Sequence, residues 1–246
     1  RICRMDNNGI WRQNHNGPTG EWLINNSADA FEAAVYFRRG NKGASFYDIG
    51  DSDSTAEFKS ISVPILDVTK GLPKVFTFDM VEGDSHLSGK PHEIIVPLSA
   101  ARKLFGERDS YLGLTFEPAK NAKAYFKITG VYRDFPKNTI VANTCYMVIP
   151  EGVYGKIKKD GISSNYQCYF RLHKGITSEL AEKDLFTKFV NNALGKKDGE
   201  EDLAKAGFRL YPLHDVYFMD KADFGGGGSR NMFLLYLMLA ILVVII

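Results

Sequence analysis

The side chains that could bind a metal are few and scattered along the chain. The five histidines, at positions 15, 86, 92, 173 and 214, include no two at the spacing of ligands on one helix face. Asp84, His86 and His92 fall within nine residues and could bind a metal together. The same segment carries Ser85 and Ser88, and this composition favours a solvated loop. We therefore expect no metal site and no cofactor.

Two further acidic patterns could suggest chemistry. Four carboxylates resemble a calcium-binding loop, but the glycine expected at its sixth position is missing, so a polar hairpin turn is the better interpretation. These are Asp48, Asp51, Asp53 and Glu57. His214 and Asp215 could form a catalytic pair, yet adjacent residues on a strand point to opposite faces. We interpret them as the end of the last strand.

Known catalytic motifs are absent from the sequence. It has no G-x-S-x-G, H-E-x-x-H, C-x-x-C or Walker A pattern. The sequence therefore predicts a domain that is not itself an enzyme.

The three cysteines are Cys3, Cys145 and Cys168. Cys145 and Cys168 lie on predicted strands that could be neighbours, and an extracytoplasmic location would permit a disulfide between them. Buried free thiols are the alternative, and the sequence leaves both open.

Composition narrows the class of protein. The 246 residues include 31 basic and 29 acidic side chains, a balance that gives no reason to expect nucleic acid as a partner. Aromatic residues make up 13% of the chain, and many stand in short alternating stretches. This favours a strand-rich α+β domain over a helical bundle.

The alternation predicts the elements that position these residues. Strands are expected at 31–38, 44–49, 56–68, 94–96, 124–134, 142–149, 166–173 and 207–213. Gly130 within one of them predicts a bulge or a close approach. Helical stretches are expected at 75–83, at 99–105 before Gly106, and at 177–194 after a cap at Thr177 or Ser178. The buried stripe of the last helix should consist of Leu180, Leu185, Phe189 and Ala193, broadened by Ala181, Phe186, Val190 and Leu194. Residues 1–26 show little periodicity and are expected to be a connector.

The C-terminal part contains a glycine run and an apolar run. Four consecutive glycines predict a flexible hinge, either natural or an engineered linker. They are Gly225, Gly226, Gly227 and Gly228. Residues 232–246 lack any charge, glycine or proline and predict a membrane helix. Its apolar residues include Phe233, Leu234, Leu235, Leu237, Leu239, Ile241, Leu242 and Val243. The run would measure about 21 Å as a helix against about 30 Å of hydrocarbon, so we expect the start of a longer helix.

Four segments in this order resemble the extracytoplasmic core domain of MacB/FtsX-type ABC transporter permeases. They are FTFDMVEGD at 76–84, EIIVPLSAARKLFG at 93–106, FKITGVYRDFP at 126–136 and RLYPLHDVYF at 209–218. The glycine-rich hinge and the apolar helix complete the pattern. The similarity covers about residues 27–246.

The resemblance implies a two-lobed α+β fold. Residues 27–70 and 141–218 would form a porter-like lobe, and 71–140 would form an inserted β-rich lobe. Residues 219–231 would be the hinge, and 232–246 would begin the second transmembrane helix of the permease.

The resemblance also implies a function in the cell membrane. The domain would lie on the periplasmic side of the inner membrane and couple ATP-driven helix motion to a periplasmic partner or substrate. Its partners would be an ATP-binding ABC subunit, a second permease copy, and a periplasmic adaptor or lipoprotein. The alternative is a tail-anchored extracytoplasmic enzyme or ligand-binding domain, which predicts a pocket with titratable groups.

Overall fold

The chain forms a mixed α/β structure that is rich in strands. The computed structural model describes residues 2–5, 11–12, 14–15, 28–38, 44–48, 60–117, 125–136, 139, 141, 143–149, 166–184 and 208–216. The strands in the first half of the chain are β1 (Ile2–Met5), β2 (Trp11–Arg12), β3 (Asn14–His15), β4 (Phe31–Arg38), β5 (Ala44–Asp48), β6 (Ser60–Val63), β7 (Ile65–Val68), β8 (Met80–Gly83), β9 (Glu93–Pro97) and β10 (Thr115–Glu117). Those that follow are β11 (Phe126–Tyr132), β12 (Cys145–Val148), β13 (Tyr166–Leu172) and β14 (Phe208–Leu210). The helices are α2 (Leu72–Val75), α3 (Leu98–Phe105) and α7 (Leu213–Val216), and residues 178–184 are also helical.

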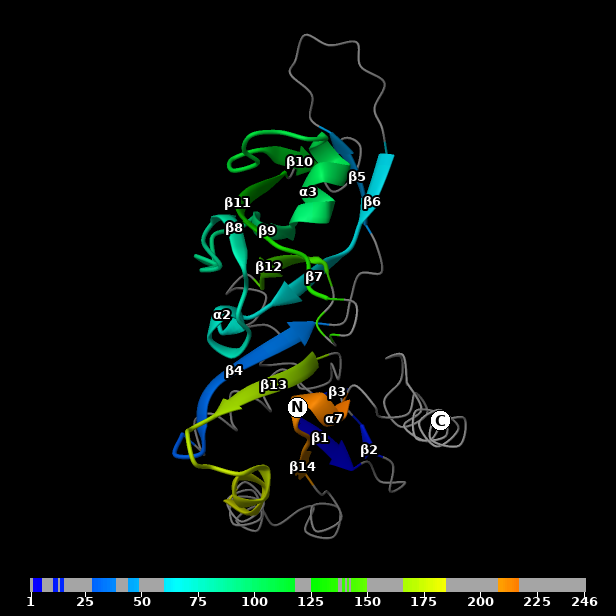
Figure 1. Cartoon of the computed structure of the whole chain (residues 1–246). Coiled ribbons are helices and arrows are strands. Elements are labelled where there is room, and N and C mark those ends of the chain that lie inside the picture. Colours follow the sequence, from blue (N-terminus) through cyan, green and yellow to red (C-terminus); the bar gives the residue numbers. More distant parts are fainter. Residues whose placement is uncertain are drawn as a thin grey trace, which may run out of the picture.

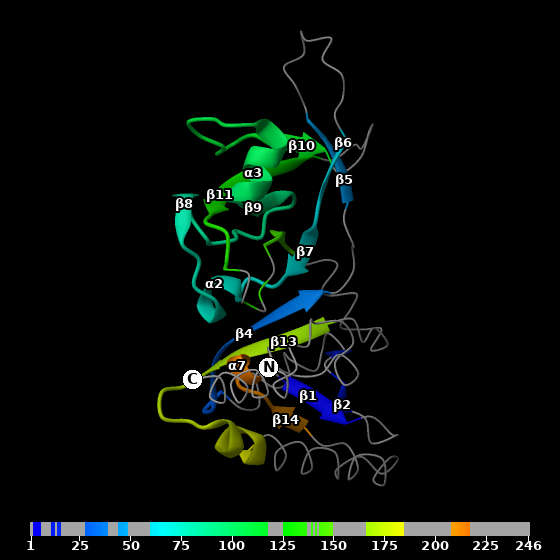
Figure 2. The same ribbon diagram turned by 45° about the vertical axis from the view of Figure 1, so that its right-hand side comes forward.

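Most strands belong to one sheet that runs through the length of the molecule (Figure 1). Its order is β3-β13-β4-β7-β12-β9-β11-β10-β5-β6, and β8 pairs with β11 as well. A second, three-stranded sheet has the order β14-β1-β2 and lies beside β13 (Figure 2). The sheet therefore connects a part around α3, which contains β8–β11 with β5 and β6, to a part built on β4 and β13.

One extended segment passes between these two parts. β6 and β7 follow each other in sequence with only Pro64 between them. β6 pairs with β5, whereas β7 pairs with β4 and β12. Because proline has no N–H to donate to a strand ladder, it is suited to the point where the segment changes partners.

Three groups of buried side chains form the core. The first lies under α3 and includes Ala101, Leu104 and Phe116, and the second joins β4 to α2, β9 and β12. Successive residues of β4 serve different groups, since Val35 belongs to the second and Tyr36 to the third. This alternation is expected for a strand that is covered on both faces.

Several elements confirm the expectations from the sequence. β4 spans residues 31–38, and β9 and β11 lie within or beside their predicted ranges. α3 buries Ala100, Ala101 and Leu104, and the chain leaves it at Gly106 with φ of 73°. A positive φ is readily adopted by glycine, which explains why the helix ends there.

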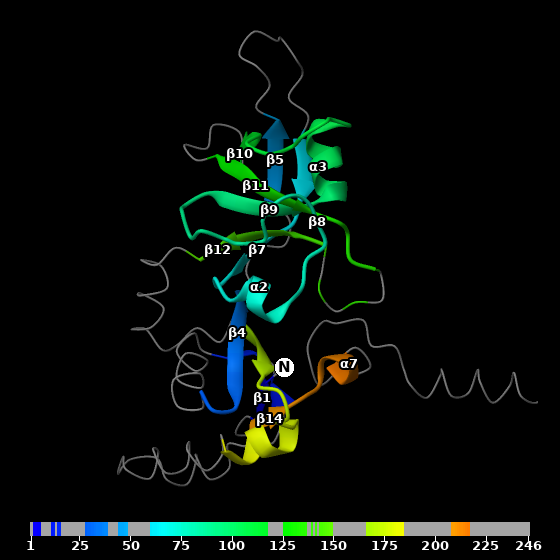
Figure 3. The same cartoon turned by 60° about the vertical axis from the view of Figure 1, so that its left-hand side comes forward.

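The predicted helical stretch at 75–83 is wrong over most of its length. α2 ends at Val75, because Phe76 is already extended, and residues 80–83 form strand β8 on β11. The helix is short and packs beside β4 (Figure 3). Residues 1–26, expected to be a connector, contribute β1 and β2 to the small sheet and β3 to the large one.

The helix that begins after Thr177 has its predicted cap, because Thr177 Oγ1 accepts a hydrogen bond from the Leu180 N–H at 3.3 Å. In the first turns the predicted buried stripe is wrong at Leu180, which is 56% exposed, and confirmed at Ala181, which is fully buried. Leu185, Phe189 and Ala193 lie outside the described residues.

Candidate functional site

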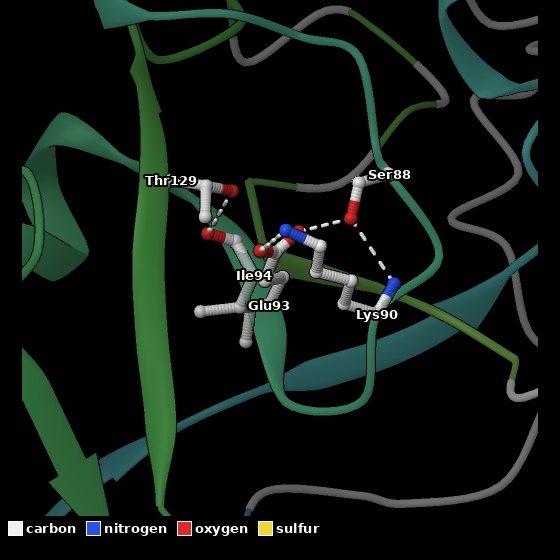
Figure 4. Close-up of polar contacts among 5 residues, drawn as sticks. All are labelled: Ser88, Lys90, Glu93, Ile94 and Thr129. Carbon is white, nitrogen blue, oxygen red and sulfur yellow. Dashed lines mark hydrogen bonds and ion pairs between the residues drawn. The ribbon is translucent and has the colours of Figure 1, made fainter.

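The loop between β8 and β9 and the strands beside it hold a group of polar contacts (Figure 4). Ser88 Oγ donates to a Glu93 carboxylate oxygen, and the Lys90 N–H donates to Ser88 Oγ at 3.1 Å. Lys90 Nζ lies 3.9 Å from the other Glu93 oxygen, and Thr129 Oγ1 donates to the Ile94 carbonyl at 3.3 Å. These groups satisfy one another at the surface, which is typical of an ordered loop rather than a reactive site.

The residues considered for a metal site in this loop do not converge. Asp84 Oδ1 accepts the His86 N–H at 2.9 Å, which makes a local turn, and the His92 ring stacks against Tyr125 with 6.5 Å between centroids. Within the part of the chain that the structure describes, no group of three His, Cys, Asp or Glu side chains could hold a metal ion.

The other two acidic patterns have different outcomes. Of the calcium-like pattern only Asp48 is among the described residues. His214 and Asp215 lie on the helix α7, so their assignment to the end of a strand is wrong. β14 ends at Leu210, and the Asp215 N–H then donates to the Pro212 carbonyl at 3.1 Å as the chain turns.

The disulfide between Cys145 and Cys168 is not formed. Neither cysteine is part of a disulfide, and both are fully buried. Their strands, β12 and β13, are separated by β7 and β4, which places the two Cα atoms about 14 Å apart at normal strand spacing. A disulfide needs Cα atoms within about 7 Å, so the buried-thiol alternative holds. Burial raises the pKa of the Cys145 thiol, which keeps it protonated and unreactive.

The segment after β11, one of the four with family resemblance, acts as a structural clamp. Arg133 Nε donates to Asp79 Oδ2 at 2.8 Å, and the Arg133 N–H donates to the Asp79 carbonyl at 2.7 Å. Asp134 Oδ1 accepts the Ser99 N–H at 3.0 Å, and a carboxylate is favourable there at the start of α3. The segment 126–136 thus contacts two of the other resembling segments, 76–84 and 93–106.

The next residue, Phe135, is held by the side chain of Asn143, eight positions further along the chain. Asn143 Oδ1 accepts the Phe135 N–H at 2.6 Å, and Asn143 Nδ2 donates to the Phe135 carbonyl at 2.9 Å. The Phe135 ring packs against Phe78 and Tyr132, with centroids 5.3 and 5.4 Å away. The backbone is therefore fixed where it leaves β11.

The chain at Pro64 is held by a hydrogen-bonded cluster, which we call the Pro64 junction (Pro64, Tyr132, Thr144 and Cys145); Pro64 is exposed, and the other three residues are buried. The Pro64 carbonyl accepts Thr144 Oγ1 at 2.6 Å and the Cys145 N–H at 3.0 Å. Tyr132 Oη donates to the Thr144 carbonyl at 2.6 Å and accepts the Thr144 N–H at 3.1 Å. Burial raises the pKa of Tyr132, so its hydroxyl stays neutral and keeps both roles.

The junction joins three segments rather than activating a group. It ties the bend between β6 and β7 to the end of β11 and the start of β12. Residues Pro64 and Thr144 are 80 positions apart, and nothing in their local sequence predicts the contact. The arrangement can hold the two parts of the sheet in a fixed relation.

A groove of about 240 Å³ lies between α2, β13 and the segment that leads into α7. Its lining is Val75, Phe76, Tyr169, Phe170, Leu172, Ser178, Leu210, Tyr211, Pro212 and Leu213. These residues come from well separated parts of the chain, so the sequence alone does not predict the groove.

The predicted hinge and membrane segment cannot be compared with the structure. Residues 225–228 and 232–246 lie outside the described residues. Among the residues that are described, no helix is both long enough and apolar enough to cross a membrane.

Comparison with known proteins relates the fold to solved structures only. No family model matches the chain, and no curated protein matches it. A domain of a protein described as a permease from Porphyromonas gingivalis superposes with a TM-score of 0.62 at 18% identity, over 86% of this chain and 89% of that one. The periplasmic region of MacB from Actinobacillus actinomycetemcomitans gives a TM-score of 0.54 at 17% identity, over 87% and 89% of the two chains.

These likenesses define the class of fold. The chain has the α/β fold found in extracytoplasmic domains of ABC transporter permeases. Within that class, its fold is of the MacB type, which confirms the resemblance seen in the four sequence segments.

Proposed function

We propose that the chain is the extracytoplasmic domain of an ABC transporter permease that passes ATP-driven motion of membrane helices to a partner or substrate outside the cytoplasm. The observation that carries this proposal is the MacB-type fold over 87% of the chain. An ATP-binding subunit and a second permease copy would complete the transporter at the inner membrane. A periplasmic adaptor or lipoprotein would be the partner.

The internal construction supports a mechanical role. The Pro64 junction holds the point where β6 passes into β7, and Asn143 holds the chain at Phe135, where it leaves β11. Such fixed connections let displacement at one end move the other end, because packed sheets do not deform continuously.

We propose the following division of the chain. Residues 27–70 and 141–218 form the lobe near the membrane, 71–140 the inserted lobe, 219–231 the hinge, and 232–246 the start of the transmembrane helix. The pairing of β5 with β10 associates the 44–63 hairpin with the inserted lobe as well.

Two experiments test the proposal: copurification with an ATPase, and a variant expected to separate ATP hydrolysis from its stimulation by the partner. The chain, expressed in its natural sequence context with ABC ATPases of the same source, should copurify with one of them and with ATP hydrolysis. Pro64→Gly should leave basal hydrolysis in place and remove its stimulation by the periplasmic partner, because the bend between β6 and β7 loosens.

The exposed Pro136 provides the control, since Pro136→Gly changes a proline outside the Pro64 junction. A chain that binds no ATPase and instead converts or binds a small molecule would overturn the proposal. That result would support a tail-anchored enzyme or ligand-binding domain.

A further inference from the structure

The groove between α2, β13 and α7 is open on a side where the large sheet ends. β3 pairs with β13 only at Tyr166 and Gln167. Among the described residues, no strand pairs with the outward edge of β13 from Phe170 to Leu172. An unpaired edge presents N–H and C=O groups that an extended segment of another chain can pair with.

The wall opposite this edge is apolar and partly exposed. Leu213 is 42% exposed, although it is a large hydrophobic residue at the start of α7. Pro212 and Leu210 continue the same wall, and Val75 and Phe76 form the end beside α2. The groove therefore offers an apolar space next to a strand edge that no strand of the described residues pairs with.

At the α2 end of the groove, no carboxylate among the described residues forms an ion pair with Arg171 or Lys74. The Arg171 guanidinium donates only to the Val75 carbonyl, at 3.4 Å, and Lys74 is exposed beside it. Two acids lie near the other wall, where Glu182 accepts the Leu210 N–H and Glu179 accepts Ser178 Oγ at 3.2 Å. These hydrogen bonds come from neutral donors and leave the carboxylates charged, so the α2 end is the positive end of the groove.

We propose that this groove binds an extended, acidic segment of a partner protein, with an aliphatic side chain in the groove and carboxylates beside Lys74 and Arg171. The segment adds as a strand to the edge of β13 at residues 170–172. The proposal rests on the proposed function and gives the chemistry of its partner.

The test uses two fluorescein-labelled peptides and the whole 246-residue chain in nonionic detergent. In one peptide leucine alternates with glutamate, and in the other leucine alternates with lysine. The glutamate peptide should bind at least about tenfold more tightly by fluorescence anisotropy, because its charges complement the rim. It should also slow amide hydrogen exchange at residues 170–172.

Variants locate the binding. Lys74→Glu with Arg171→Glu should weaken the glutamate peptide by about tenfold, whereas Lys174→Glu, an exposed lysine outside the groove, should not. Leu213→Ser should weaken it several-fold, and the exposed Leu180→Ser should leave it unchanged.

Each contrary result overturns the proposal. Equal binding of both peptides would show that charge does not select the ligand, and no binding would show that the groove is not free. Self-association that Leu213→Ser abolishes would assign the groove to a second copy of the chain. None of these results would change copurification with an ATPase, so they leave the proposed function standing.

Discussion

At the scale of single residues, Tyr132 shows how one hydroxyl can hold a junction. Its Oη serves both the N–H and the carbonyl of Thr144. Tyr132→Phe would leave these two buried backbone groups without their partner while keeping the ring in place. We expect a loss of about 2 kcal/mol in the free energy of unfolding, measured by chemical denaturation. Tyr125→Phe is the control, since Tyr125 is 56% exposed, and an equal loss in both variants would contradict the role of the hydroxyl.

The carboxyl of Asp67 should make the stability of the fold decrease as the pH rises, which is the reverse of the effect of most surface carboxylates. Burial raises the pKa of its carboxyl, and Arg38, whose Nη1 lies 3.5 Å away, only partly opposes this. A raised pKa means that the folded chain binds the proton more tightly than the unfolded chain, so stability falls as the pH rises through that pKa.

Asp67→Asn removes this titration. Relative to the variant, the natural chain should lose stability as the pH rises above the ordinary pKa of an aspartate carboxyl, as measured by denaturant unfolding at several pH values. If the natural chain instead gains free energy of unfolding relative to Asp67→Asn as the pH rises, the ion pair with Arg38 outweighs the effect of burial.

The sequence predicted those residue-scale features that depend on local geometry. Gly130 was expected to mark a bulge or a close approach, and the register between β11 and β9 does shift between Ile128 and Gly130. A Cβ on Gly130 would lie 2.5 Å from the Asp84 carbonyl oxygen. The partners in the Pro64 junction could not be predicted, because their contacts depend on how distant segments are brought together.

At the scale of elements, α2 depends on a glycine where it meets β4. A Cβ on Gly71 would lie 1.9 Å from the Ala34 carbonyl oxygen, and its φ of −72° is one that any residue can adopt. The effect of Gly71→Ala is therefore a steric one. We expect a loss of about 3 kcal/mol in the free energy of unfolding, since backbone must move away from backbone.

Gly106→Ala separates this effect from backbone strain. A Cβ on Gly106 meets nothing within 4 Å, but its φ of 73° and ψ of −166° lie in a region that is essentially restricted to glycine, so the cost of backbone strain should be about 1 to 3 kcal/mol. A loss below about 1 kcal/mol for Gly71→Ala, measured by chemical denaturation, would show that α2 can shift to make room.

Elements with a clear repeat or clear end residues were predictable, and those without were not. β4 follows from its run of strand-forming residues, and α3 follows from its spaced apolar residues and Gly106. The 75–83 stretch failed because its apolar residues suit a helix or a strand, and pairing with β11 decided the outcome. α7 was missed because four residues are too short to show a helical period.

At the scale of the whole molecule, the order of segments was more informative than any one of them. The four resembling segments pointed to a MacB-type fold, and the solved structures share that fold at 17–18% identity. The sequence did not predict that β1 to β3 join the sheets, or that a groove forms between α2, β13 and α7. Both depend on contacts between residues far apart in the chain.

The pairing of β1 with β14 has a consequence for how the chain is made. Ile2 lies opposite Leu210, so β1 waits roughly 200 residues of synthesis for its partner β14. At about 5–20 residues per second, that wait lasts on the order of 10 to 40 seconds. Until then the edge of β1 that pairs with β14 has no partner from that strand, so we expect β1 to depend on protection by a chaperone until β14 has been made.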